Sequence, residues 1–146
     1  MPADPIVRTY DPKQIVVTFG PVIVTGYASG TFVQIARNGD LFEKVRGADG
    51  GVDRVNLNAG DFSVTLTLKQ TSIANDALSG ILEQDRLTNT GKYPLLIKDL
   101  NGLSLFTAPQ SWIGKDPDDE FSDTMSNREW RFDTGTSVKV SGGNIL

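Results

Sequence analysis

A strict alternation of apolar and polar residues between positions 62 and 69 constrains the fold of this chain more than any other feature. Every second residue of Phe62-Ser63-Val64-Thr65-Leu66-Thr67-Leu68-Lys69 is apolar, and the residues between them carry hydroxyl or amino groups. Because successive side chains of a β-strand point to opposite faces, this pattern predicts a strand with one buried and one solvated face. Such a strand needs a second layer to cover its apolar side.

Other segments show the same pattern or the turn residues that separate strands. Gly20-Pro21 predicts a tight turn between two short strands. Asn101-Gly102 predicts a hairpin turn, because Asn-Gly readily adopts the positive φ angles that such turns need. The further predicted strands cover residues 15–19, 22–25, 31–37, 41–45, 52–57, 95–98, 103–106, 112–113, 129–132 and 136–140.

One stretch favours an α-helix, at about residues 72–87. Ser72 or Asn75 can cap its N-terminus. Apolar residues recur there at helical spacing, at Ile73, Ala77, Leu78, Ile81 and Leu82. No linker or repeat divides the sequence, so we expect one domain, residues 1–146, with a mainly β fold. Two packed antiparallel sheets would form a split β-barrel or sandwich with this one flanking helix.

The hairpin expected at residues 41–57 differs from the others. Its tip, residues 46–51, is rich in glycine, and its two strands are less apolar than those of a core hairpin. We therefore expect it to project from the body as an arm. The two ends of the chain, residues 1–10 and 133–146, are the expected mobile segments, because termini are mobile until an interaction fixes them.

Composition removes several classes of chemistry. The 146 residues include no Cys and no His, which excludes cysteine nucleophiles, histidine bases, disulfides and the usual His/Cys metal sites. The net charge of −4 disfavours tight binding to nucleic acid phosphates. Residues 1–13 lack the apolar core of a secretory signal, and the longest apolar run, residues 15–28, is interrupted by Gly20-Pro21. We therefore expect a cytoplasmic product without a membrane partner.

One motif resembles an active site. Phe132-Asp133-Thr134-Gly135-Thr136 matches the signature of aspartic proteases, in which two aspartates share a proton and activate water. Residues 137–146 do not contain the flap and supporting strands that such a protease needs. A polar turn after the strand that holds Trp130 is the preferred interpretation. Since no other catalytic constellation is present, we predict a protein that is not an enzyme and has no cofactor or metal.

An acidic segment follows the strand at residues 112–113. Residues 115–123 contain one Lys and five acidic residues, which are Asp116, Asp118, Asp119, Glu120 and Asp123. Three interpretations are open: a solvated loop, an acidic surface that faces a partner or a lumen, and a calcium site. The spacing differs from that of an EF-hand, which needs an Asp-x-Asp-x-Asp-Gly order and a terminal Glu.

A series of segments along the chain is similar to one known family. In order, they are Tyr10-Asp11-Pro12, Val16-Val17-Thr18-Phe19-Gly20, Gly26-Tyr27-Ala28-Ser29-Gly30-Thr31-Phe32, Gly47-Ala48-Asp49-Gly50, Val64-Thr65-Leu66-Thr67-Leu68, Gln70-Thr71-Ser72, Asn75-Asp76, Leu96-Ile97-Lys98-Asp99-Leu100-Asn101-Gly102, Ala108-Pro109, Trp112-Ile113 and Arg128-Glu129-Trp130. Over about residues 10–132, their order and spacing resemble the tail tube proteins of contractile-tailed bacteriophages.

The resemblance implies a structural subunit of the virion tail that resides in the host cytoplasm before assembly. Six copies would form a ring, and rings would stack into a tube whose lumen conducts genomic DNA during ejection without tight binding. The implied partners are further copies of the chain, the tail sheath, the tape measure and baseplate or initiator proteins. By analogy the arm lies at the subunit interface, through Leu41, Phe42, Val45, Gly47, Asp49, Gly50, Val52, Val55 and Leu57. The acidic segment would then face the lumen or the next ring.

Two other functions fit the same residues. A tube subunit of a related contractile secretion system or bacteriocin would have the same fold and a different cargo. A carbohydrate-binding β-sandwich is the alternative from another class, because Ser63, Thr65 and Thr67 form a stripe of hydroxyl groups that could bind a sugar.

Overall fold

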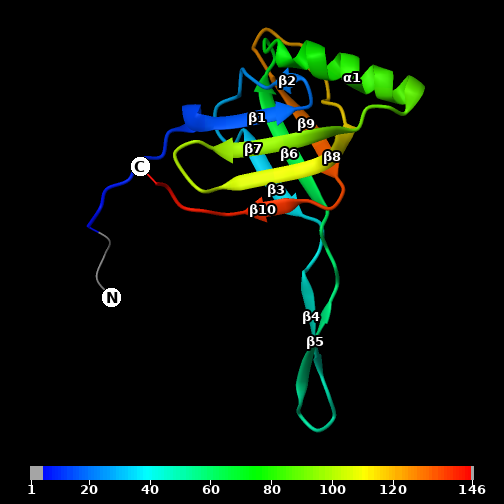
Figure 1. Cartoon of the computed structure of the whole chain (residues 1–146). Coiled ribbons are helices and arrows are strands. Elements are labelled where there is room, and N and C mark those ends of the chain that lie inside the picture. Colours follow the sequence, from blue (N-terminus) through cyan, green and yellow to red (C-terminus); the bar gives the residue numbers. More distant parts are fainter. Residues whose placement is uncertain (1–4, 146) are drawn as a thin grey trace.

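The computed structural model describes residues 5–145, which form ten β-strands, one α-helix and a short 3-10 turn (Figure 1). The 3-10 turn spans Pro12–Gln14 and the helix α1 spans Ala74–Thr88. The strands are β1 Ile15–Phe19, β2 Val22–Ile23, β3 Val33–Arg37, β4 Phe42–Arg46, β5 Val52–Asn56, β6 Phe62–Lys69, β7 Tyr93–Asp99, β8 Leu105–Lys115, β9 Asn127–Thr134 and β10 Val138–Val140. The predicted mainly β fold with a single helix is confirmed.

All strand pairings in the described residues are antiparallel. Eight strands share one sheet, in the order β2-β1-β7-β8-β9-β6-β3, with β10 also paired to β8. The two remaining strands, β4 and β5, pair only with each other. The large sheet folds over on itself, so that β1 and β7 cross in front of β6 and β9 in the view of Figure 1. The result is the expected sandwich-like arrangement, and β2 and β3, at the two ends of the order, do not close it into a barrel.

The strand β8 belongs to both layers because it contains a bulge. Tyr93 on β7 pairs with Ser111, whereas Leu95 pairs with Ala108, so β8 has one residue more than β7 over this interval. Pro109 and Gln110, within the bulge, are both exposed. A strand can turn the corner between two packed layers at such a bulge. The sequence predicted two separate strands here, and the structure joins them into one.

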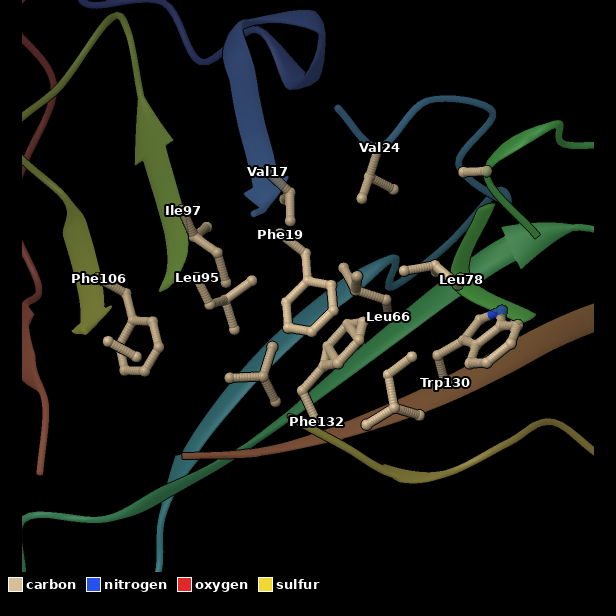
Figure 2. Close-up of a cluster of buried hydrophobic side chains, with 14 of the residues drawn as sticks. Val17, Phe19, Val24, Leu66, Leu78, Leu95, Ile97, Phe106, Trp130 and Phe132 are labelled. Atoms are coloured by element: carbon tan, nitrogen blue, oxygen red, sulfur yellow. The ribbon is translucent and has the colours of Figure 1, made fainter. Parts of the chain in front are cut away.

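The core lies between the two layers (Figure 2). The rings of Phe19 on β1 and Phe132 on β9 stack with their centroids 4.9 Å apart, and those of Phe62 on β6 and Phe106 on β8 meet edge to face at 5.1 Å. All four side chains are fully buried. Aromatic pairs of this kind add about 0.5–1.5 kcal/mol to the stabilisation by area burial alone.

Helix α1 covers one end of this core through Ala74 and Leu78. It begins two residues after the predicted start, and Ser72 helps to fix that start: its Oγ accepts a hydrogen bond from the Ala74 N–H at 3.2 Å and donates one to the Thr25 carbonyl at 2.6 Å. The helix ends at Thr88 and is capped by Asn89, which has a left-handed backbone with φ of 56°. Asparagine tolerates this conformation and commonly ends helices in this way.

The turn between β7 and β8 differs from the prediction. Neither Asn101 nor Gly102 adopts the left-handed backbone of a two-residue hairpin turn. The connection instead packs against the C-terminal segment, where the Leu103 N–H donates to the Gly143 carbonyl at 2.9 Å. A β-carbon at residue 102 would lie 2.7 Å from that carbonyl oxygen. Glycine is therefore required here for a close approach of two backbones rather than for a positive φ.

The segments expected to be mobile make contacts with the body where the structure describes them. Asp133 and Thr134 end β9, and β10 pairs with β8. The Asn144 side-chain amide donates to the Thr9 carbonyl at 2.6 Å, so residues near the two ends lie side by side. Residues 1–4 and 146 of these segments lie outside the described part of the chain. Within that part, no helix is long and apolar enough to cross a membrane.

Candidate assembly surfaces

The arm, residues 41–57, leaves the body between β3 and β6 and extends away from it (Figure 1). Its strands β4 and β5 pair from Phe42 opposite Asn56 to Arg46 opposite Val52, and every residue of both strands is exposed. At about 3.3 Å per residue, its length from base to tip is roughly 25–30 Å. A lone two-stranded hairpin in water is only marginally stable. The arm therefore lacks the covering layer that the other strands have.

Hydrogen bonds at the base of the arm fix its direction. The Asn38 backbone N–H donates to the Asp61 carbonyl at 3.1 Å, and its side-chain amide donates to the Asp61 carboxylate at 3.2 Å. The Arg37 guanidinium lies over the Phe62 ring at 4.4 Å and donates to the Ala59 carbonyl. These contacts hold the base of the arm against the body.

The glycine-rich tip forms a compact turn. The Gly50 N–H donates to the Gly47 carbonyl at 3.0 Å, and the Gly47 N–H donates to the Gly51 carbonyl at 2.7 Å. The Asp49 carboxylate accepts the Gly51 N–H at 2.9 Å. Gly50 has φ of 89°, a backbone conformation that favours glycine. The tip residues predicted to form an interface, Gly47, Asp49 and Gly50, therefore shape the turn.

The two faces of the arm differ in chemistry, as the strand register shows. Residues directly opposite each other across a strand pair lie on the same face. One face, which we call the basic face, presents Phe42, Lys44, Arg46, Val52, Arg54 and Asn56. Its three cations make no described ion pair, although the Arg54 guanidinium lies 4.2 Å from the centre of the Phe42 ring.

The opposite face, which we call the acidic–apolar face, carries four aliphatic side chains and two carboxylates. They are Leu41, Glu43, Val45, Asp53, Val55 and Leu57. Each aliphatic side chain is 44–47% exposed. Several half-exposed aliphatic residues in one row are typical of a surface that another protein covers. Of the predicted interface residues, the structure thus places Leu41, Val45, Val55 and Leu57 on this face, and Phe42 and Val52 on the basic face.

The acidic segment lies at the other end of the body. Strand β6 begins after the arm and ends before α1, and β9 pairs with it so that Asn127, just after the acidic segment, lies opposite Lys69. The arm and the acidic segment are therefore attached to opposite ends of these eight-residue strands. The Ser126 N–H and hydroxyl both donate to the Gln70 side-chain oxygen, at 3.0 and 3.2 Å, and hold the segment beside the start of α1.

The five carboxylates of this segment do not act as one group. Asp119 forms an ion pair with Arg128, and Asp118 pairs with Lys115 at 3.2 Å. Asp116, Glu120 and Asp123 make no described ion pair. No set of three acidic side chains within residues 5–145 is arranged to hold a metal ion. Three of the five carboxylates are therefore left without a described counter-charge.

Sequence reasoning missed Arg128, although its position in the alternation of β9 could have identified it. Arg128, Trp130, Phe132 and Thr134 all point to the buried side of the strand. The Arg128 side chain is only 10% exposed, and its charge is balanced by Asp119 and by the Phe121 ring at 5.3 Å. A charged residue at a core-facing position of a strand is a signal of a buried ion pair.

The aspartic protease motif has a structural role at the end of β9. The Thr134 hydroxyl accepts the Phe62 N–H at 3.0 Å and so joins β9 to the start of β6. The Asp133 carboxylate lies 3.4 Å from both the Ser63 hydroxyl and the Arg131 guanidinium. The polar turn predicted at Asp133-Thr134-Gly135 begins later than expected, because β9 continues to Thr134 and the chain bends at Gly135.

Tyr27 has an unsatisfied polar group. Its hydroxyl is buried and has no hydrogen-bond partner among residues 5–145. Burial raises the pKa of Tyr27 above its ordinary value of about 10, because the phenolate would lose its hydration. The Val17 backbone lowers the pKa, but the effect of burial is larger.

Comparison with known proteins places these surfaces in context. No protein-family model matches the chain. A curated protein, "Structural protein ORF10" of Pseudomonas phage KPP10, is 32% identical over 145 residues, and the match covers 93% of this chain and 83% of that protein. The chain belongs to this family of phage structural proteins. The family assignment agrees with the absence of a catalytic constellation in the sequence.

Solved structures of tail-like particles have the same fold as this phage structural protein. The tube-terminating cap of the anti-feeding prophage superimposes with a TM-score of 0.64 and 14% identity, over 94% of this chain and 96% of that chain. A chain of the sheath–tube complex of an extracellular contractile injection system gives a TM-score of 0.58 and 12% identity, over 91% and 92%. At these identities the likeness concerns the fold alone.

Proposed function

We propose that this phage structural protein is a tail tube subunit, in which six copies form a ring and rings stack through the arm. The observation that carries the proposal is the arm itself, with its two exposed strands and its row of half-exposed aliphatic side chains. A second copy is the natural covering layer for it.

The position of the arm favours an open stack over a closed dimer. It leaves one end of the body, while α1 and the acidic segment lie at the other end (Figure 1). A contact between one end of a subunit and the other end of the next is heterologous, and such contacts repeat along an axis unless a rotation closes them. Stacking of this kind gives a tube.

A tube of this composition suits the passage of DNA. The chain has a net charge of −4, and an acidic wall would repel phosphate, so that a duplex slides without adsorbing. The tail sheath, the tape measure and the baseplate or initiator proteins are the partners of such a tube. Their role here rests on the family likeness and on the folds of the tail-like particles described above.

Electron microscopy of the purified protein, beside a variant in which residues 42–56 are replaced by a short glycine turn, tests the proposal. We expect rings or hollow tubes from the parent chain and folded, unstacked particles from the variant, because the body packs without the arm. Circular dichroism checks that the variant remains folded. Tubes formed by the armless variant would show that stacking does not use the arm.

A tube terminator is the second candidate, favoured by the higher TM-score of the tube-terminating cap than of the sheath–tube chain, 0.64 against 0.58. The same micrographs separate the two functions. A terminator forms single rings that do not stack on themselves at any concentration, whereas a tube subunit forms stacks whose length grows with concentration.

A further inference from the structure

The chain contains two Asn-Gly pairs, and the fold holds them in different ways. Asn38-Gly39 follows β3, where the arm leaves the body, and Asn101-Gly102 lies in the connection between β7 and β8. An asparagine side chain can react with the backbone nitrogen of the next residue, and glycine there gives the least steric hindrance because it has no side chain. The surroundings of each pair therefore decide whether that nitrogen can reach the side-chain amide.

Gly39 has room to move toward the Asn38 side chain. It is exposed, its φ is 109°, and a β-carbon at this residue would meet nothing within 4 Å. Its N–H donates to the Arg37 carbonyl at 3.1 Å, a local hydrogen bond within the turn. A ring formed between the Gly39 nitrogen and the Asn38 side chain would break this local contact and would have open space beside Gly39.

Two side chains hold the Asn38 amide by its two polar atoms. The Ser63 hydroxyl donates to the Asn38 Oδ1 at 3.0 Å, and the Asn38 Nδ2 donates to the Asp61 carboxylate at 3.2 Å. The Asp133 carboxylate is farther from the same hydroxyl, at 3.4 Å, so the Asn38 oxygen is the better-placed acceptor. Negative charge develops on Oδ1 when a nitrogen attacks the amide carbon. A hydroxyl that already donates to this oxygen stabilises that charge.

The second pair is packed where the first is open. Gly102 is buried, and a β-carbon there would lie 2.7 Å from the Gly143 carbonyl oxygen. The Asn101 N–H donates to the Asp99 carboxylate at 2.9 Å, and the Asn101 carbonyl accepts the Ile145 N–H at 2.7 Å. Moving the Gly102 nitrogen toward the Asn101 side chain would disturb this packing. The second pair is therefore an internal reference with the same two residues.

We propose that Asn38 is a site of spontaneous deamidation. The Gly39 nitrogen loses its proton and forms a bond to the Asn38 Cγ, the bond from Cγ to Nδ2 breaks, and Nδ2 leaves as ammonia. Water then opens the cyclic imide at either of its carbonyl carbons and leaves aspartate or isoaspartate at residue 38. The reaction consumes one water molecule, releases one ammonia and involves no oxidation. It does not depend on the proposed role of the arm in assembly.

The product changes the contacts at the base of the arm. A carboxylate oxygen replaces the Nδ2 donor, so the hydrogen bond from residue 38 to Asp61 becomes a repulsion between two carboxylates. Isoaspartate also adds a methylene group to the backbone between β3 and the arm. Both changes oppose the backbone hydrogen bond from the Asn38 N–H to the Asp61 carbonyl. Deamidation should therefore loosen the base of the arm.

Peptide mapping by mass spectrometry of the folded full chain during storage in buffer tests the proposal. We expect Asn38 to convert about tenfold faster than Asn101, because the packing around Gly102 must first be broken. In concentrated urea, which removes that packing, the two rates should become similar. Equal rates in the folded chain, or a faster rate at Asn101, would overturn the proposal. A tenfold difference that persists in urea would also overturn it, since the neighbouring residues rather than the fold would then be the cause.

Two variants test the role of Ser63. Ser63→Ala should slow the conversion of Asn38 about fivefold, because it removes the donor to Oδ1. Thr65→Ala, two residues further along the same strand β6, is the matched control and should leave the rate unchanged. Circular dichroism checks that both variants remain folded. An unchanged or faster conversion in Ser63→Ala would contradict activation by this hydroxyl.

The effect on the arm has its own measurement. Asn38→Asp, which reproduces the aspartate product, should raise the hydrogen-exchange rate of the backbone N–H at residue 38 about tenfold, because that N–H donates across the base of the arm. Asn101→Asp is the matched control and should leave exchange at residue 38 unchanged. If exchange at residue 38 is the same in Asn38→Asp and the parent chain, deamidation does not loosen the base of the arm.

Discussion

Strands β6 and β5 are close in sequence, yet one is buried and the other is exposed along its whole length. In β6 every second residue lies in the core, whereas each residue of β5 faces solvent. Both strands have hydrogen-bonded neighbours, so backbone pairing does not distinguish them. The difference is the second layer, which β6 has within its own chain. Strand β5 carries apolar residues for a layer that its own chain does not supply.

The largest expected effect is the loss of a core ring from the body. Phe132→Ala should lower the free energy of unfolding by about 3–5 kcal/mol, because it leaves a cavity beside the Phe19 ring, 4.9 Å away. Thermal or urea denaturation measures the change. Phe42→Ala in the arm is the control, and we expect less than about 1 kcal/mol there because Phe42 is 44% exposed. Similar losses from both variants would contradict the distinction between body and arm.

Removing the partner of the buried arginine should have the second-largest effect. Asp119→Asn leaves the Arg128 guanidinium, only 10% exposed, without its counter-charge. Since Asp119 itself is mostly exposed, we expect a loss of about 1–3 kcal/mol, below the roughly 3–5 kcal/mol that breaking a fully buried pair costs. Asp118→Asn, which breaks the exposed pair with Lys115, should cost about 0–0.5 kcal/mol. Equal stability of the two variants in urea denaturation would argue against a structural role for Arg128.

Tyr27→Phe should stabilise the body by about 1 kcal/mol at neutral pH, because it removes a buried hydroxyl that has no hydrogen bond. The pH dependence has a definite sign. Because burial raises the pKa of Tyr27, the folded chain holds the phenolic proton more tightly than the unfolded chain, and the free energy of unfolding falls as the pH rises above about 10. Denaturation between pH 8 and 11, a range set by the usual tyrosine pKa, should show a shallower fall in Tyr27→Phe than in the parent chain. Tyr10→Phe, which removes an exposed tyrosine, is the control.

The smallest effect on stability is expected in the arm, where the effect on assembly should be large. Val45→Ser should change the free energy of unfolding of the isolated subunit by less than about 0.5 kcal/mol, since Val45 is nearly half exposed. The same change should shift the concentration at which particles form, because it places a hydroxyl against the apolar part of the proposed contact. Light scattering over a dilution series measures that shift. Unchanged assembly would mean that Val45 lies outside the contact.

The body could be predicted from the sequence where burial repeats with a simple period. The limits of β6 coincide with the predicted residues 62–69, because one side of that strand is fully buried and the other is not. The single strand β8 could not be predicted, since Pro109 and Gln110 interrupt its alternation and the bulge reverses which residues face the core. The prediction for the Asn101-Gly102 turn was wrong, because glycine is needed at residue 102 for the close approach of the Gly143 backbone, which is distant in sequence.

The candidate surfaces also differ in whether local sequence features could predict them. The arm could be recognised from its glycine-rich tip and its low apolar content, which are local features. The position of the acidic segment beside α1 could not, because it depends on the hydrogen bonds from Ser126 to the Gln70 side chain, which only the folded sheet brings together. Arg128 could be predicted in part. Its core-facing position follows from the alternation of residues in β9, but its partner Asp119 is known only from the structure.

The hydrogen bond between the Asn144 side chain and the Thr9 carbonyl holds residues near the two ends of the chain together. The order of the segments along the chain can therefore be changed by circular permutation. Residues this close can be joined by a short linker, and new termini can be opened at the tip of the arm, where the backbone is exposed. In such a circular permutant each arm strand becomes a free chain end, while the eight-stranded sheet keeps every pairing. Removal of one of these free ends would leave a body with a single arm strand, and the other strand could be added later as a peptide.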